Sequence, residues 1–365
     1  MSELVNARDN RATIRWKLLT GASALALTGY ISSTALAKAE DSGHPVLWLD
    51  LGGQFQQLTD PSETWVPANL PPVIDHPVAP AANQTPRIGY DASAGLTFQP
   101  EGSDWSFSAS IKYGKAKRGP KFAHDQTYKT KPREGKYVIT TYAFTNLHAV
   151  EETKHLILDF SAGEDVGIGL FGSHASSDVK FGIRIAQFHD RSDGFMTAQT
   201  SVPAKYAGSS AQGKIISAYV HSRRSFDGAG PSIAWNSAVP IVGSMRDGLT
   251  IDWGANAAFL FGRQKTKVTT HNQKIGYVGF TSAGTHLAST VITNATRPYS
   301  RAKHVTVPNL GGIVALSFRK GNAKVSFGYK ADFFFNAIDG GIATRKTENR
   351  GFYGPFATLS VGLGR

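Results

Sequence analysis

The chain has 365 residues, of which 41% are hydrophobic and 11% aromatic, and its formal net charge is +12. It contains no cysteine, which excludes disulfides and thiolate chemistry. The basic excess favours lipid phosphates or small anions as partners, and we expect no nucleic-acid partner because no recognition helix or zinc-finger spacing occurs.

The N-terminus predicts export. An apolar run over residues 18–30 follows a basic leader and leads to Ala35-Leu36-Ala37, the order that a signal peptidase recognises. The leader contains Arg8, Arg11, Arg15 and Lys17. We therefore predict a signal peptide over 1–37, cleaved after Ala37, and one mature domain over 38–365. The alternative is an uncleaved anchor, since residues 18–37 are about as long as a membrane-spanning helix.

The mature sequence has no second long apolar stretch, and its regular signal is alternation with period two. The clearest hairpin covers residues 87–114, where apolar side chains alternate with small or polar ones on both sides of a turn at 100–104. Similar runs lie at 47–55, 179–186, 249–262, 314–336 and 356–363, with less regular ones near 156–161, 233–236 and 275–280.

Several of these runs reach the nine to eleven residues that a tilted strand needs to cross a bilayer, whereas sandwich strands usually have about five or six. Aromatic residues often lie near the strand ends, as at membrane interfaces. We therefore predict an all-β fold, an antiparallel transmembrane β-barrel of roughly ten to twelve strands with long external loops.

Alternation also assigns charged side chains to the inner face of this barrel, where they would line a wet lumen. The expected lumen-facing residues are Asp50, Asp91, Lys112, Lys180, Arg184, Asp252, Lys324, Lys330 and Asp332. A register error of one residue would place them in lipid instead.

Two segments are expected to be external loops. Residues 60–86 hold seven of the 17 prolines and cannot form a central strand. The second is a basic loop that contains Lys115, Lys117, Arg118, Lys121, Lys129, Lys131, Arg133 and Lys136. It would form an anion funnel or contact lipopolysaccharide phosphates; the alternative is a solvated loop without a specific ligand.

No motif predicts a cofactor, a metal or a catalytic residue. Residues 167–172 match a dinucleotide-binding glycine pattern, but a turn and another alternating strand follow in place of the required helix. The eleven histidines show no metal-ligand spacing. A hydrolase site in the barrel wall stays open as an alternative, because the order of a catalytic triad along a chain varies.

The later two-thirds of the chain resembles the Legionella-type major outer membrane protein group of pore-forming proteins. The segments that carry the resemblance are 307–312 (VPNLGG), 327–341 (FGYKADFFFNAIDGG) and 351–356 (GFYGPF), with weaker matches at 158–169, 226–231 and 260–263. The resemblance implies an outer-membrane barrel with a water-filled channel and no catalytic residues. The chain departs from outer-membrane barrels in ending Leu363-Gly364-Arg365, where the barrel-assembly machinery usually recognises an aromatic residue.

These observations lead to three hypotheses for a protein of the Gram-negative outer membrane. The first is a porin-like pore that passes small hydrophilic solutes and prefers anions. The second is a plugged structural barrel whose basic loop contacts lipopolysaccharide or a host surface. The third is an enzyme in the barrel wall. The expected partners are outer-membrane lipid and lipopolysaccharide, small hydrophilic solutes and the barrel-assembly machinery.

Overall fold

The fold is a β-barrel, described by a computed structural model over residues 46–58, 87–121, 127–129, 141–166, 176–201, 212–245, 247–280, 286–340 and 347–363. The predicted signal peptide, its cleavage after Ala37 and the proline-rich segment 60–86 lie outside these residues. The strands are β1 (Val46–Leu58), β2 (Arg87–Gln99), β3 (Trp105–Lys121), β4 (Thr127–Lys129), β5 (Thr141–Asp165), β6 (Ser176–Ser201), β7 (Gln212–Gly243), β8 (Asp247–Phe280), β9 (His286–Lys320), β10 (Ala323–Asp339) and β11 (Thr347–Leu363).

Ten of these strands close into one antiparallel ring. Neighbours in sequence pair with each other, β3 pairs with β5, and β1 pairs with β11 to complete the circle. The short strand β4 pairs with β5 alone. Closure removes the sheet edges that would otherwise expose backbone hydrogen-bonding groups to lipid. The predicted antiparallel transmembrane barrel is therefore confirmed, and the strand number lies within the predicted range.

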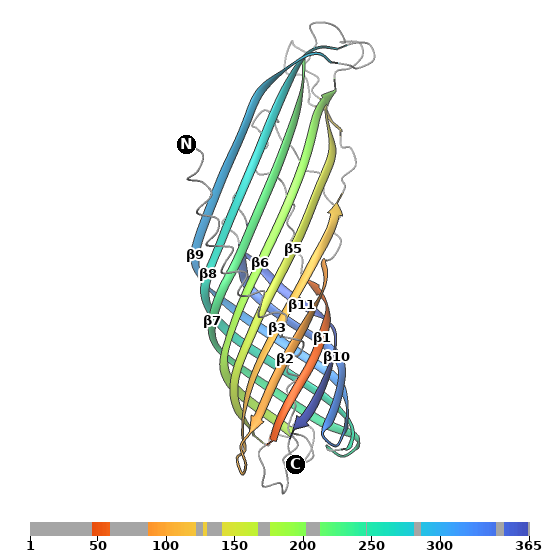
Figure 1. Ribbon diagram of the computed structural model, residues 1–365, viewed down its shortest axis with the longest axis vertical. Helices are drawn as coiled ribbons and strands as arrows, with labels where there is room; N and C mark the ends of the chain where they lie inside the picture. Colours follow the sequence, from red (N-terminus) through yellow and green to blue (C-terminus); the bar gives the residue numbers. More distant parts are fainter. Residues whose placement is uncertain are drawn as a thin grey trace, which may run out of the picture.

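The two ends of the barrel differ. At one end, here called the short-turn end, brief turns such as 100–104 and 321–322 join neighbouring strands. At the other end, β5 to β9, which are 25 to 35 residues long, continue well beyond β1, β2, β10 and β11, which have 13 to 17. Figure 1 shows these five strands rising together above the closed ring. We call this part the extension.

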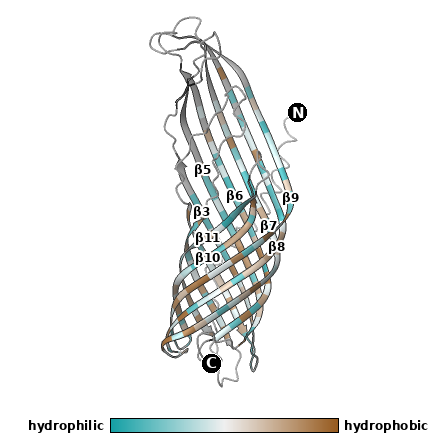
Figure 2. Cartoon of the chain, turned by 180° about the vertical axis from the view of Figure 1, so that it is seen from behind, coloured by the Kyte–Doolittle hydropathy of each residue, from teal (hydrophilic) through white to brown (hydrophobic). Residues whose placement is uncertain are grey.

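Where the structure describes them, side chains alternate between the two faces of the wall along the strands of the closed barrel, with a break at the register shift in β10, as period-two geometry requires. Near the short-turn end the outer face carries large apolar side chains, among them Phe98, Phe181, Phe259, Leu316 and Phe327, each at least 42% exposed. Figure 2 shows this apolar colouring concentrated in the closed barrel and more hydrophilic residues along the extension. The apolar outer face near the short-turn end is thus the lipid-facing surface.

The less regular segments predicted near 156–161, 233–236 and 275–280 belong to β5, β7 and β8, so those strands are confirmed. Strict alternation along the run 314–336 would place Asn336 on the inner face with Lys330 and Asp332, and this is wrong. A register shift between Phe334 and Ile338 places Asn336 on the exposed side with a φ of 58°. Asparagine tolerates this left-handed conformation, and here its side chain accepts a hydrogen bond from Thr347 at 2.7 Å.

Strand β9 has an open edge in the extension. It pairs with β10 only as far as the register pair Asn309–Phe334. Among the described residues, 286–308 of β9 therefore pair with β8 alone. The described part of the chain also contains no helix that is both long and apolar enough to cross a membrane.

Candidate functional site

The candidate site is the lumen. The structure places all nine side chains that alternation assigned to the inner face there, and each is at most 7% exposed. These side chains come from six strands, β1, β2, β3, β6, β8 and β10, which are far apart in the sequence. Closure of the ring brings them together. A wet inner face was expected from the small and polar residues of the alternating pattern. The described inner side chains instead pack against one another and are largely shielded from solvent.

Lys112 is the centre of the first group of inner contacts. Its Nζ lies 3.2 Å from Asp91 Oδ2 and 3.4 Å from Asp332 Oδ2, and it donates to Gln54 Oε1 at 3.1 Å. Lys330 approaches the same Asp332 oxygen at 3.5 Å. Four strands therefore meet across the lumen through one lysine. Two carboxylates and an amide oxygen are the partners that a buried ammonium group requires.

Arg184 forms a second group farther around the ring. Its guanidinium makes a bidentate contact with the Asp159 carboxylate, with distances of 2.6 Å from Nε and 3.1 Å from Nη2. Its Nη1 also donates to the side-chain oxygens of Asn256, at 2.8 Å, and of Asn309. The planar fork of arginine suits this bidentate geometry, which fixes the side chain across the lumen.

A third group lies nearer the short-turn end. Lys324 Nζ is 2.5 Å from Asp252 Oδ2, which also accepts a hydrogen bond from Ser317 at 2.7 Å. Arg319 lies over the Trp48 ring, 5.0 Å from its centroid, a cation–π contact. Lys180 donates to Ser108 at 3.0 Å. Polar contacts thus extend from the middle of the lumen to its end.

Positive and negative side chains are equal in number in these three groups and their neighbours, which we call the lower ionic network. The cations are Lys112, Lys180, Arg184, Arg319, Lys324 and Lys330, and the carboxylates are Asp50, Asp91, Asp159, Asp178, Asp252 and Asp332. This part of the lumen consequently has no excess of positive charge to favour anions.

A polar cavity of about 90 Å³ remains beside this network, which is room for a few water molecules. Serine hydroxyls line it together with Lys180, Arg184, Asn236 and Asn256. It is the part of the described lumen best suited to hold water or a small polar solute.

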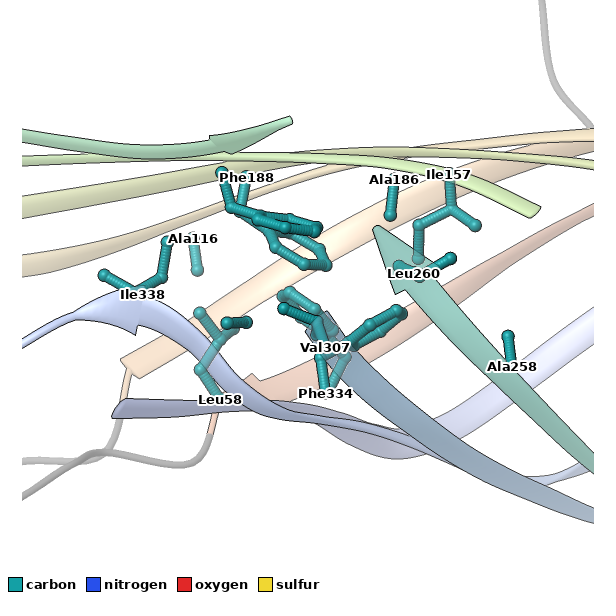
Figure 3. Close-up of a cluster of buried hydrophobic side chains, with 13 residues drawn as sticks. Leu58, Ala116, Ile157, Ala186, Phe188, Ala258, Leu260, Val307, Phe334 and Ile338 are labelled. Carbon is teal, nitrogen blue, oxygen red and sulfur yellow. The ribbon is translucent and has the colours of Figure 1, made fainter. Parts of the chain in front are cut away.

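Toward the extension the lumen is filled by apolar side chains. Phe188 packs against the rings of Phe334, Phe352 and Phe226, with centroid distances of 4.7, 5.7 and 5.8 Å. All four rings are fully buried, and they belong with Leu58, Leu260 and Ile338 to the cluster of 13 apolar residues that Figure 3 draws. We call this cluster the phenylalanine layer. Sequence reasoning missed it, although Phe188 and Phe352 do occupy inward positions in the period-two pattern.

A second group of charges lies beyond the phenylalanine layer. Asp190 is paired with Arg350 and lies 3.5 Å from Arg224 Nη2, while Arg224 Nη1 reaches Glu348 Oε2 at 2.9 Å. Arg301 pairs with Asp339. We call these residues the upper ionic network. Sequence reasoning missed it because its members come from β6, β7, β9, β10 and β11, and neither face of the extension is apolar enough to show alternation.

The predicted basic loop is partly a strand, and that part of the prediction is wrong. Lys115, Lys117, Arg118 and Lys121 continue β3, and Lys129 lies in β4. Lys115 and Lys117 face outward and contact Glu152 at 3.3 and 3.6 Å. The alternation continues in this part of β3, since Ala116 is buried between the outward lysines. The strand was not recognised from the sequence because its outer face carries lysines and no apolar residues. Lys131, Arg133 and Lys136 lie outside the described residues.

Glu152 shows how this outer surface is organised. It also contacts Lys154 at 3.0 Å. Burial alone would raise the pKa of Glu152, but hydrogen bonds from Lys154 and Lys115 outweigh burial and lower it. One carboxylate therefore forms ion pairs with three lysines.

The described residues do not form a metal site, since no three or more His, Asp or Glu side chains gather in a ligand arrangement there. The glycine pattern at 167–172 lies outside the described residues. The fold and the lumen define a transmembrane β-barrel of ten strands whose described interior is filled by two ionic networks and an apolar layer between them.

No family model and no curated protein matches the chain. Solved structures give weak likenesses. A variant of the TodX monoaromatic hydrocarbon channel has 9% identity and a TM-score of 0.21, over 92% of this chain and 95% of that one. The Ralstonia pickettii toluene transporter TbuX has 9% identity and a TM-score of 0.20, over 88% and 90% of the two chains. At such values nothing about those proteins' substrates is transferred to this chain.

Proposed function

We propose that this chain is a barrel of the Gram-negative outer membrane that passes small hydrophilic solutes through a pore, and that the structure corresponds to its closed state. The single observation that carries the proposal is the lower ionic network. Ionisable side chains inside a membrane-spanning wall cost more than apolar packing would, and such residues usually mark an ion or solute pathway. The resemblance of residues 327–341 to the Legionella-type group supports the same proposal, which includes insertion by the barrel-assembly machinery.

In this proposal the phenylalanine layer is the gate. Hydrophobic constrictions close channels by excluding water, and in this layer Phe188 packs against three other fully buried rings across the lumen. Because cations and carboxylates are equal in number in the lower ionic network, the anion preference expected from the sequence gains no support there. We propose a pore with little charge preference.

Conductance in planar bilayers tests this proposal. We expect brief, small openings from the wild-type protein, and a higher open probability when Phe188→Ala and Phe334→Ala remove two rings of the layer. Phe335→Ala is the matched control, since its ring lies on the outer face and is 38% exposed. A folded wild-type protein that never conducts, beside a double variant that conducts steadily, would show that the layer is a permanent plug. Silence from both proteins would rule out the pore.

The second candidate is a closed barrel that acts through its outer surface. The observation in its favour is that the upper ionic network closes the lumen again beyond the phenylalanine layer, with Arg350 fully buried between Asp190 and Glu348. A permanent plug needs such redundancy and a gate does not. The conductance experiment separates the two candidates.

A further inference from the structure

The outer face of the wall changes from apolar to basic within a few residues of each strand. One row of register partners, Ile111, Leu158, Ile185, Ala229 and Phe261, still belongs to the apolar surface. Outward positions repeat every two residues, which is about 7 Å along a strand. The change therefore occurs over the thickness of a lipid headgroup region.

Two successive rows of the extension carry the basic residues. The first joins Lys115, Lys154, His189, Ser225 and Lys265 across five strands.

The next row, one outward step farther from the apolar surface, joins Lys117, Glu152, Arg191, Arg223 and Lys267. Arg191, Arg223 and Lys267 are thus direct neighbours on three strands, and Arg191 is paired with Asp193 at 2.8 Å. Like charges opposite each other destabilise a sheet, so the remaining pair, Arg223 and Lys267, favours an anionic partner.

The two sides of these rows differ in how far their charge is neutralised. On β3 and β5, Glu152 contacts all three nearby lysines. On β7 and β8, Arg223, Lys265 and Lys267 are exposed, as is Arg263, which lies one row nearer the apolar surface and opposite Asp227. None of the four forms an ion pair within the described part of the chain. We call these four residues the basic stripe. Figure 2 shows hydrophilic colouring along β7 and β8 in this region.

We propose that the basic stripe binds the phosphate groups of lipopolysaccharide in the outer leaflet. Its distance from the apolar row matches headgroup depth, and it lies toward the extension, opposite the short turns that face the periplasm in barrels of this kind. Exposed Arg and Lys bind phosphate by charge-assisted hydrogen bonds. The proposal rests on the outer-membrane location proposed above and does not depend on whether the lumen conducts. The proposed lipopolysaccharide contact is thus on the outer face of β7 and β8, whereas the sequence had suggested a basic loop.

Binding of the purified full-length protein to lipopolysaccharide vesicles tests the proposal with a matched pair of variants. Lys265→Gln/Lys267→Gln neutralises the stripe, whereas Lys115→Gln/Lys117→Gln removes the same charge from the same two rows on β3. A lysine near an anionic surface contributes about fivefold in affinity. We expect a loss of about 25-fold for the stripe variant and of less than about fivefold for the control, whose lysines already contact Glu152.

Two further measurements identify the ligand. Dephosphorylated lipopolysaccharide should bind the wild-type protein no better than intact lipopolysaccharide binds the stripe variant. Equal losses in the two variants, or equally tight binding to phosphatidylglycerol vesicles, would overturn the proposal in favour of nonspecific attraction. Conductance of the stripe variant in lipopolysaccharide-free bilayers should equal that of wild type, which separates failure of this proposal from failure of the pore.

Discussion

Lys112 offers a direct measure of how dry the lumen is. Lys112→Met removes a buried cation and leaves carboxylates without compensation, a change that costs about 3 to 5 kcal/mol for a buried ion pair. Asp332 keeps Lys330 at 3.5 Å, so the uncompensated charge is chiefly that of Asp91. We therefore expect a loss near the lower limit, about 3 kcal/mol in the free energy of unfolding.

Urea unfolding in lipopolysaccharide-free lipid vesicles, followed by tryptophan fluorescence, would measure this loss. Lys117→Met on the same strand is the control: its side chain is 63% exposed and its contact with Glu152 is worth at most about 1 kcal/mol. Adding Asp91→Asn to Lys112→Met should restore most of the stability, because it removes the uncompensated charge. If Lys112→Met costs no more than Lys117→Met, the lumen is hydrated enough to screen its charges, and the reasoning from a filled interior is refuted.

Three other outcomes follow from the described contacts. Phe334→Ala should reduce stability by about 3 to 5 kcal/mol in the same assay, and the outward Phe335→Ala by much less. Burial alone would raise the pKa of Asp193, but hydrogen bonds from His221 and Arg191 outweigh it and lower that pKa. Its stabilising contribution is present above the unfolded pKa and is lost as pH falls through the folded one, so Asp193→Asn should destabilise near pH 7 and progressively less as the pH is lowered below 3.8. Asn336→Gly should change stability by less than about 1 kcal/mol, whereas Asn336→Val should lower it, since β-branched residues avoid a positive φ; thermal unfolding of both variants checks this.

The sequence predicted the closed barrel well where lipid faces the wall. The hairpin over 87–114 corresponds to β2 and β3, and the inward positions of Lys112, Asp91 and Lys330 follow from alternation alone. In that part of the wall one face must be apolar, so the period-two contrast is strong.

The extension could not be predicted in the same way. Both faces of its strands meet water or polar neighbours: Arg224 points inward and Arg223 outward on β7. Without an apolar face the alternation has no contrast, and β3 beyond Tyr113 therefore resembled a loop. The ionic networks also depend on register and closure, since Arg350 and Asp190 are 160 residues apart in the chain. No local pattern encodes such a contact.

The open edge of β9 exposes the extension to strand addition by another molecule, which the closed barrel avoids. More than twenty consecutive residues, 286–308, present one row of backbone donors and acceptors to which a strand of another molecule could be added. Pro298 and Pro308 interrupt that row because proline has no amide hydrogen to donate. Arg297 and Lys303 add charge that would be brought close to the same charges on a second copy. The composition of β9 thus limits unwanted sheet growth between molecules crowded in one membrane.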